Sequence, residues 1–411
     1  MKQIAVIGAG VSGLACARML EEKGCRVRVY ERSASPGGLI RCERVNGSLF
    51  HLCGGHVFNT KNTAVAEWFW SIFSKDKDFH LANRNSAVCM EDGRFVQYPI
   101  ENHIYQLDER VQASIMDDWL TGSAGSIDNF AEFLCSRFGR TLYELYFEPY
   151  NRKVWRRDLS CVPLEWLQGK LPMPSIKEML LANINRVAEK SFVHSTFWYP
   201  QNNGSQFIAD TLAAGLDIAY NCEVTEIRRL ESGRVVVNGE MFDEVVFCGN
   251  LKELPAILKG RIPVDGFAAE IERLEFHGTT AVFCETDDIP YSWFYQPSQR
   301  HQSHRFICTG NFADTNNSPG MMTSTVEFTD SITEEEIKRQ LAYMPFCPKY
   351  LARHYSKYTY PIQRHNTRQM VRDLKVTLCA CGIHLVGRFA EWEYFNMDAA
   401  IASAMDMVAS R

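Results

Sequence analysis

The sequence has no long apolar stretch, no long basic run and no internal repeat, and each absence excludes a class of protein. No hydrophobic run reaches the length of about 20 residues that a membrane-spanning helix needs. Lysine and arginine together number 44, against 49 aspartates and glutamates, and no basic cluster is long enough to follow a nucleic-acid backbone. We therefore predict no membrane span and no nucleic-acid partner.

Cysteine, although present 14 times, lacks the spacing of a zinc site or of a disulfide framework. Cys379 and Cys381 are separated by one residue within an apolar run, and Cys53 precedes two glycines. The first residues already form a strand pattern, which leaves no room for a signal peptide. We therefore expect no metal site, reduced thiols and a cytoplasmic location.

What the sequence does contain is a dinucleotide-binding pattern at its beginning. A β-branched run, Gln3 to Ile7, leads into Gly8-Ala9-Gly10-Val11-Ser12-Gly13, and a helical pattern follows from Leu14 to Lys23. Gly8 permits a tight turn, Gly10 lets backbone approach a pyrophosphate, and Gly13 lets the helix pack on the strand. The helix N-terminus attracts phosphate. A second strand pattern, 26–30, then places Glu31 to bind a ribose, and a glycine-rich turn without a ligand is the alternative.

The residues after Glu31 indicate which dinucleotide is bound. A polar turn that begins with Arg32 is followed by Gly37-Gly38-Leu39 and then by Arg41. Such a turn keeps the backbone close to a long cofactor, which favours FAD over NAD. The run resembles the two-dinucleotide-binding flavoproteins, a family that includes amine oxidases and protoporphyrinogen oxidase. The resemblance implies FAD as the cofactor, with Arg41 near the flavin.

Helical and strand patterns divide the rest of the chain. The segment 101–150 is dominated by helical periodicity that Pro149 breaks, and 266–328 alternates like a separate antiparallel sheet. Three strand-like runs, 223–228, 234–238 and 243–248, predict a meander. The 411 residues, 46% of them hydrophobic and 23% charged, suit two or three globular domains.

We predict a mixed α/β fold, in which a Rossmann-like FAD-binding domain carries a helical insertion and an antiparallel β-sheet domain. The predicted limits are 1–83, 201–258 and 376–411 for the FAD-binding domain, 84–102 and 259–375 for the sheet domain, and 103–200 for the helical substrate domain. The aromatic segment 196–204 is a candidate lid because it precedes an Asn-Asn-Gly turn.

Three further places carry side chains that suit a ligand site. His56 follows two glycines, so its imidazole can face a flat group, although an ordinary loop histidine explains it equally well. The segment 148–155 mixes Tyr150 and Trp155 with cations, which suits a base and a phosphate; a core helix is the alternative. Near the C-terminus, a helix beginning at Met397 can direct its free amides at an anionic flavin.

Three motifs together resemble the UDP-galactopyranose mutase family: 54–60, 149–155 and 387–398. They occur in the family's order and at similar spacings over nearly the whole chain. The resemblance implies that reduced FAD attacks the anomeric carbon of a nucleotide sugar, and that the sugar returns with a different ring size and no net redox change. The protein then has to hold the flavin against the sugar, bind the pyrophosphate with cations and stack the base.

The resemblance also implies roles for single residues. The catalytic candidates are His56, beside the flavin, and Arg305 and Arg388, which would hold the diphosphate. The substrate-binding candidates are Tyr150, Trp155, Lys170, Tyr360 and Tyr394. The cofactor-binding candidates are Gly8, Gly10, Ser12, Gly13, Glu31, Arg32, Gly38, Leu39, Arg41, His56, Val224, Gly387, Arg388, Asn396 and Met397. As alternatives, Arg388 pairs with Glu391 or Glu393, and Tyr360 is an ordinary strand end.

The chain also departs from the mutase pattern. Lys170 stands where the family has arginine, which keeps the charge but loses the bidentate fork, and Pro174 occupies a position that is usually cationic. The leading function is a flavin-dependent nucleotide-sugar mutase, an isomerase for surface polysaccharide or secondary-metabolite assembly. The alternatives are an FAD-dependent oxidoreductase and a flavin-binding scaffold without turnover. The expected partner is a small-molecule substrate, and the sequence is compatible with a homodimer.

Overall fold

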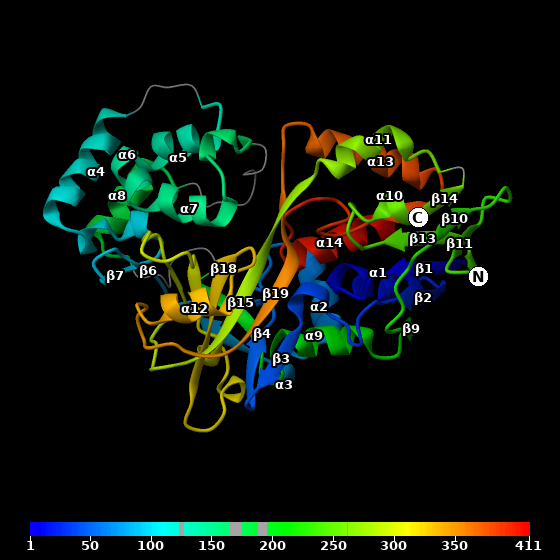
Figure 1. The fold of residues 1–411 in the computed structure, drawn as a ribbon, viewed down its shortest axis with the longest axis horizontal. Helices are drawn as coiled ribbons and strands as arrows, with labels where there is room; N and C mark the ends of the chain where they lie inside the picture. Colours follow the sequence, from blue (N-terminus) through cyan, green and yellow to red (C-terminus); the bar gives the residue numbers. More distant parts are fainter. Residues whose placement is uncertain (123–126, 165–173, 188–194, 261) are drawn as a thin grey trace.

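The structure, a computed structural model, describes residues 1–122, 127–164, 174–187, 195–260 and 262–411. A parallel sheet with its helices, a seven-stranded sheet and a helical layer make up the molecule (Figure 1). Figure 1 shows the parallel sheet at the right, near both chain ends, and the helical layer at the upper left. The predicted mixed α/β fold is confirmed.

The parallel sheet has five strands in the order β20-β13-β1-β2-β9. They are β1 (Gln3–Ile7), β2 (Arg26–Tyr30), β9 (Ile218–Ala219), β13 (Glu244–Phe247) and β20 (Ile383–Leu385). Successive residues of β1 face opposite sides, so that Ile4 and Val6 enter one core cluster and Ala5 and Ile7 another. Strands from three distant parts of the chain therefore build one sheet.

The predicted three-strand meander is wrong in its last strand. The run 243–248 forms β13, which pairs in parallel with β1 at Val6 and Val246. The neighbouring sheet is made of β10 (Ile227–Arg229), β11 (Val235–Val237), β12 (Glu240–Phe242) and β14 (Leu258–Gly260). An alternating pattern cannot distinguish these pairings, because it records which residues are buried and not which strand lies alongside.

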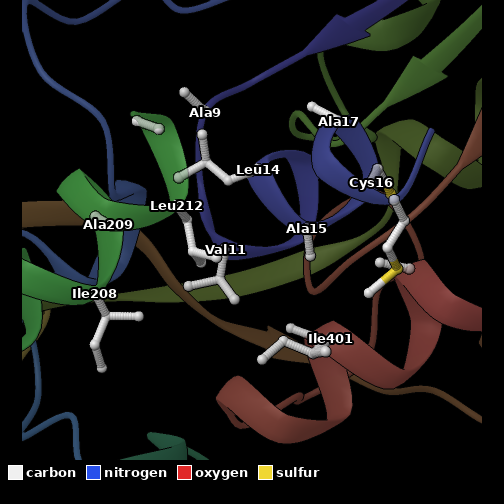
Figure 2. Close-up of a cluster of buried hydrophobic side chains, with 14 of the residues drawn as sticks. Ala9, Val11, Leu14, Ala15, Cys16, Ala17, Ile208, Ala209, Leu212 and Ile401 are labelled. Atoms are coloured by element: carbon white, nitrogen blue, oxygen red, sulfur yellow. The ribbon is translucent and has the colours of Figure 1, made fainter. Parts of the chain in front are cut away.

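Helices from three segments cover one face of the parallel sheet. They are α1 (Val11–Glu22), α9 (Gly204–Ala213) and α14 (Met397–Ala409). Figure 2 shows Leu14 of α1, Leu212 of α9 and Ile401 of α14 in one apolar cluster. Around this face and the opposite one lie α2 (Thr63–Ile72), α3 (Lys75–Asp78), α10 (Leu254–Ile257), α11 (Asp265–Glu272) and α13 (Thr367–Cys379).

The large sheet has seven strands in the order β19-β15-β18-β17-β16-β6-β7. They are β6 (Ser86–Cys89), β7 (Phe95–Gln97), β15 (Glu275–Thr286), β16 (Trp293–Tyr295), β17 (Arg305–Ile307), β18 (Met322–Thr329) and β19 (Lys349–Ile362), and α12 (Glu334–Leu341) packs beside them. The predicted antiparallel sheet is present, but β6 and β16 pair in parallel. That pair joins the two segments predicted to share this sheet.

The helical layer consists of α4 (Glu109–Thr121), α5 (Phe130–Phe138), α6 (Arg140–Leu142), α7 (Glu148–Trp155) and α8 (Ile176–Ile184). The predicted break at Pro149 is wrong. A π-helical turn over Tyr143–Phe147 leads into α7, so Pro149 lies in the first turn of α7, where its missing N–H is tolerated. Within the described ranges, no helix is long and apolar enough to cross a membrane.

Two small two-stranded antiparallel sheets complete the fold. One pairs β3 (Cys42–Val45) with β4 (Ser48–His51), and the other pairs β5 (Phe79–Asn83) with β8 (Thr196–Pro200). The predicted lid at 196–204 is wrong, because Phe197 and Tyr199 of β8 are buried in an aromatic cluster. Each of the fourteen cysteines, all of which lie in described ranges, is a free thiol.

Candidate active site

A large cavity lies where the parallel sheet, the seven-stranded sheet and the helical layer meet. Its volume is about 1950 Å³, and its wall includes Gly10 at the start of α1, Arg305 of β17 and Ala182 of α8. Pockets for a single small ligand measure roughly 300–1,000 Å³. The cavity therefore has room for a dinucleotide and for a second ligand beside it.

The dinucleotide end is shaped by the glycines between β1 and α1. Gly8 has φ +101°, a conformation that L side chains rarely adopt, and a Cβ on Gly13 would lie 1.9 Å from the Gly8 carbonyl oxygen. A Cβ on Gly10 would meet no atom within 4 Å, so the space above it is open to a ligand. The first N–H groups of α1 lack intrahelical acceptors and face the same space.

Glu31 is held in place at the end of β2. Its two carboxylate oxygens accept hydrogen bonds from the N–H groups of Ala9 and Ser33, each at 2.8 Å. The side chain is buried at the cavity wall, and each oxygen keeps a second lone pair for a ligand hydroxyl. This arrangement suits the ribose contact that the sequence predicts.

The structure brings nearly all the predicted cofactor residues to this cavity. Those that line it are Gly8, Gly10, Ser12, Gly13, Glu31, Arg32, Gly38, Leu39, Arg41, His56, Val224, Arg388, Asn396 and Met397. Gly387 lies behind the wall, where a Cβ would come within 2.4 Å of the Ser12 hydroxyl oxygen. Its N–H donates to Glu391 at 2.8 Å, so its part in the site is to let two segments pack closely.

His56 lies in a loop that is fixed from both sides. Its own N–H donates to Nδ1 of His51 at 3.3 Å, and the N–H of Gly54 donates to Glu327 at 2.8 Å. Burial, together with the charge of Arg388, lowers the pKa of His56 to about 4, so the ring is neutral at pH 7. Its Nε2 is buried without a hydrogen-bond partner in the described protein, which leaves it for a ligand.

Arg305 of β17 lines the same cavity and forms an ion pair with Glu327. Glu327 is fully buried, and His304 lies 3.5 Å from the same carboxylate oxygen. Burial alone would raise the pKa of Glu327, but Arg305 and His304 hold it below its usual range. The pair therefore presents a fixed guanidinium whose charge is largely balanced from behind.

Arg388 is fixed by carbonyl groups and an aromatic ring. Its Nη1 donates to Phe395 O at 3.0 Å and its Nη2 to Thr359 O at 2.5 Å, while its guanidinium carbon lies 4.1 Å from the centre of the Tyr394 ring. The alternative pairing does not occur, since Glu391 pairs with Lys375 and Glu393 with Arg368. Nε of Arg388 has no partner in the described protein.

The predicted substrate residues are only partly brought together. Tyr394 lines the cavity, whereas Tyr360 stacks behind it with ring centres 5.4 Å apart. Trp155 is 5% exposed and packs edge-on against Tyr360, and Tyr150 stacks on Tyr146 within the helical core. Trp155 therefore lies in the helical core, as the alternative interpretation of this segment has it, and not on the cavity wall. Lys170 lies outside the described residues.

The cavity residues that the sequence did not predict include Arg84, Tyr98 and Tyr295. Arg84 donates to the Tyr295 hydroxyl at 2.9 Å and lies 5.3 Å from the centre of the Tyr98 ring. Their sequence signals are weak, because Arg84 stands between two asparagines and both tyrosines fit a strand pattern. Glu327 offered a better signal as a lone acid in the strand 323–328, which is otherwise apolar or hydroxylated.

The start of α14 completes the site. Asn396 caps the helix with extended backbone and no side-chain hydrogen bond, and Met397 and Asp398 line the cavity. The helix begins where the sequence predicted, so its free amides and partial positive charge face the cavity. A family model described as flavin containing amine oxidoreductase matches residues 11–406.

The chain belongs to this flavoprotein family. Flavin is thus its cofactor, and the open space at Gly10, the ribose-binding geometry of Glu31 and the unpartnered Nε2 of His56 fit FAD.

Curated proteins similar in sequence to this chain include two sugar-nucleotide mutases. UDP-galactopyranose mutase of Mycoplasma pneumoniae is 21% identical over 97% of this chain and 94% of its own length. dTDP-fucopyranose mutase of Escherichia coli is 26% identical over 42% of this chain and 46% of its own length, so this second match spans less than half of that protein.

A crystal structure of reduced UDP-galactopyranose mutase superposes with a TM-score of 0.87 at 21% identity, covering 99% of this chain and 95% of that one. The flavoprotein therefore has the fold of that mutase.

Proposed function

We propose that this flavoprotein is a nucleotide-sugar mutase, which interconverts the pyranose and furanose rings of a sugar while the sugar nucleotide keeps its oxidation state. The observation that carries the proposal is the pair of fixed guanidinium groups, Arg305 and Arg388, on the cavity wall beside the flavin-binding end. Glu327 balances Arg305, but no described carboxylate pairs with Arg388. The site therefore has an excess of positive charge that suits a diphosphate.

The same charge argues against an amine as substrate. A primary amine is a cation at neutral pH, and Arg388 would repel it in a cavity of low dielectric constant. His56 is neutral and does not change the sign of that charge. An oxidoreductase acting on a neutral group stays the second candidate, because the family's description names oxidoreductases and aromatic side chains such as Trp293 and Tyr98 also line the cavity.

Each side chain has a task in the proposed reaction. Arg388 holds the diphosphate through its free Nε and through the rigid placement of its guanidinium, and Tyr394 orients that guanidinium. His56 keeps a neutral ring against the cofactor, and the α14 N-terminus stabilises negative charge there. When bound, reduced FAD supplies the electron-rich ring nitrogen that reacts with the anomeric carbon.

The similarity to relatives supports the same proposal. The Mycoplasma protein, which is matched over nearly its full length, is a UDP-galactopyranose mutase, and the E. coli protein acts on a dTDP-sugar. Both names describe a nucleoside diphosphate joined to a hexose. We propose the same substrate class here, with the base and the sugar to be found by experiment.

The test uses the purified holoprotein, reduced with dithionite under argon and supplied with UDP-, dTDP- and GDP-hexoses. Chromatography is expected to show a furanose isomer that accumulates only while the flavin is reduced. If no sugar isomerises, and a substrate instead bleaches the oxidised flavin until air restores it, the protein is an oxidoreductase. Absence of both results would favour a scaffold role.

A further inference from the structure

Glu101 is a buried acid at the cavity wall, and neither Arg305 nor Arg388 pairs with it. It lies in a short 3-10 turn, Ile100–Asn102, in which Ile100 is buried in the helical core. Glu101 itself is 5% exposed and lines the cavity together with Tyr98 and Asn102. Helix α8 holds the turn from the other side, since Asn183 donates to the Glu101 carbonyl oxygen at 2.9 Å.

The Glu101 carboxyl group has almost no partner within the protein. Among the described residues, no cation pairs with it, and its own backbone N–H is the one hydrogen-bond donor that acts on it. Such a buried acid is costly unless something else satisfies it. Burial raises the pKa of Glu101 to about 7, so near neutral pH a large share of the molecules carries a neutral acid there, which can both donate and accept.

The charge pattern of the cavity limits what this group can meet. A phosphate would be repelled by a carboxylate, and Arg305 and Arg388, the cations that suit a phosphate, are held by other groups and not by Glu101. A neutral acid is instead matched by a neutral group that also donates and accepts, which is the chemistry of a hydroxyl. In a nucleotide sugar such groups are concentrated on the hexose.

We infer that Glu101 hydrogen-bonds one hydroxyl group of the bound hexose and so selects which sugar the enzyme accepts. The inference rests on the proposed function and adds to it a specificity-determining residue. A buried polar group that loses its ligand partner discriminates strongly, because the unpaired group stays desolvated. Removal of the matching hydroxyl is therefore expected to weaken binding by about 10- to 100-fold.

The test measures calorimetric binding of UDP-galactopyranose and its 2-, 3-, 4- and 6-deoxy derivatives to the FAD-loaded protein. The variants are Glu101→Met, which keeps the length without polar atoms, Glu101→Ala as a smaller apolar side chain, and Glu101→Gln, which keeps a donor and an acceptor. Glu335→Gln on the exposed face of α12 is the control for a lost carboxylate.

Wild-type protein is expected to bind one deoxy derivative at least about tenfold more weakly than the parent sugar nucleotide. Glu101→Met and Glu101→Ala should bind that derivative and the parent equally, while Glu101→Gln and Glu335→Gln keep the preference. If the apolar variants discriminate as the wild type does, or if the wild type shows no preference, the inference is overturned and the proposed function stands. A wild type that binds none of these sugar nucleotides, nor UDP, overturns both.

Discussion

Arg305 donates from Nε to the buried carboxylate of Glu327, and the other oxygen of that carboxylate accepts the N–H of Gly54 at 2.8 Å. One acid of β18 thus connects a cation of the cavity wall with the loop that carries His56. The position of both groups depends on a side chain that does not itself line the cavity.

Replacement of Glu327 by glutamine should therefore affect both stability and binding. The change leaves Arg305 buried without its counter-charge, and we expect the free energy of unfolding to fall by about 3 to 5 kcal/mol. Urea denaturation measures the loss. The control is Glu285→Gln, which breaks the surface pair with Lys349 and should cost about 1 kcal/mol or less. Equal effects of the two changes would contradict the role given to Glu327.

Two glycines of the first turn should behave differently when changed to alanine. The Cβ of Gly13→Ala would overlap the Gly8 carbonyl, so we expect a less stable fold, by about 1 to 3 kcal/mol. Gly10→Ala has free space within the protein and should fold normally, but its methyl group enters the space left for the pyrophosphate. Flavin absorbance per protein and urea midpoints separate the two effects. A Gly10→Ala protein with full flavin content would argue against that placement.

Lysine in place of Arg388 should weaken diphosphate binding while the flavin stays bound. Lysine keeps the charge but lacks the rigid planar fork that donates to Phe395 O and Thr359 O and at the same time stacks on Tyr394. We expect the Kd for UDP to rise by about 10-fold or more. Arg372→Lys, on the exposed side of α13, is the matched control and should leave the Kd unchanged. Unchanged UDP affinity in Arg388→Lys would remove the main support for a diphosphate.

The pH dependence of stability should reveal the buried acid at 101. The pKa of Glu101 is about 7 in the folded protein and about 4.3 when unfolded. Between these values the folded state binds more protons, so the contribution of Glu101 to stability is full below pH 4.3 and is lost as the pH rises through 7. Glutamine does not titrate, and Glu101→Gln should gain about 3 kcal/mol relative to wild type between pH 4.5 and 8. If the difference in unfolding free energy between Glu101→Gln and wild type stays the same from pH 4.5 to 8, the result contradicts the burial of an ionisable group at this position.

Local patterns were sufficient wherever neighbours in the sequence are also neighbours in the site. Gly8, Gly10 and Gly13 belong to one turn, and the strand before them and Glu31 after them follow within a single β-α-β unit. The start of α14 at Met397 could equally be predicted, because a glycine turn and an amphipathic helix are local features of the sequence. Each of these residues, apart from those of the strand interior, lines the cavity.

Patterns failed where a partner outside the segment decided the outcome. The run 196–204 has the composition of a mobile turn, but β5 gives it a strand partner and an aromatic cluster buries it. A proline usually ends a helix, but Pro149 lies in the first turn of α7, directly after a π-helical turn, and the chain stays helical there. The strand of 243–248 was recognised, yet its place beside β1 depends on contacts across more than 200 residues of chain.

The sequence by itself determined that this chain binds a dinucleotide and belongs with flavoproteins, because the phosphate-binding turn is encoded in consecutive residues. Only the tertiary structure decided which further side chains line the cavity beside the dinucleotide site. It brings Arg305 of β17, Arg388 after β20 and Glu101 of a 3-10 turn to one cavity, and it moves Trp155 into the core. The physical reason is that charge balance and burial depend on every group nearby in space, and those groups come from segments that share no local pattern.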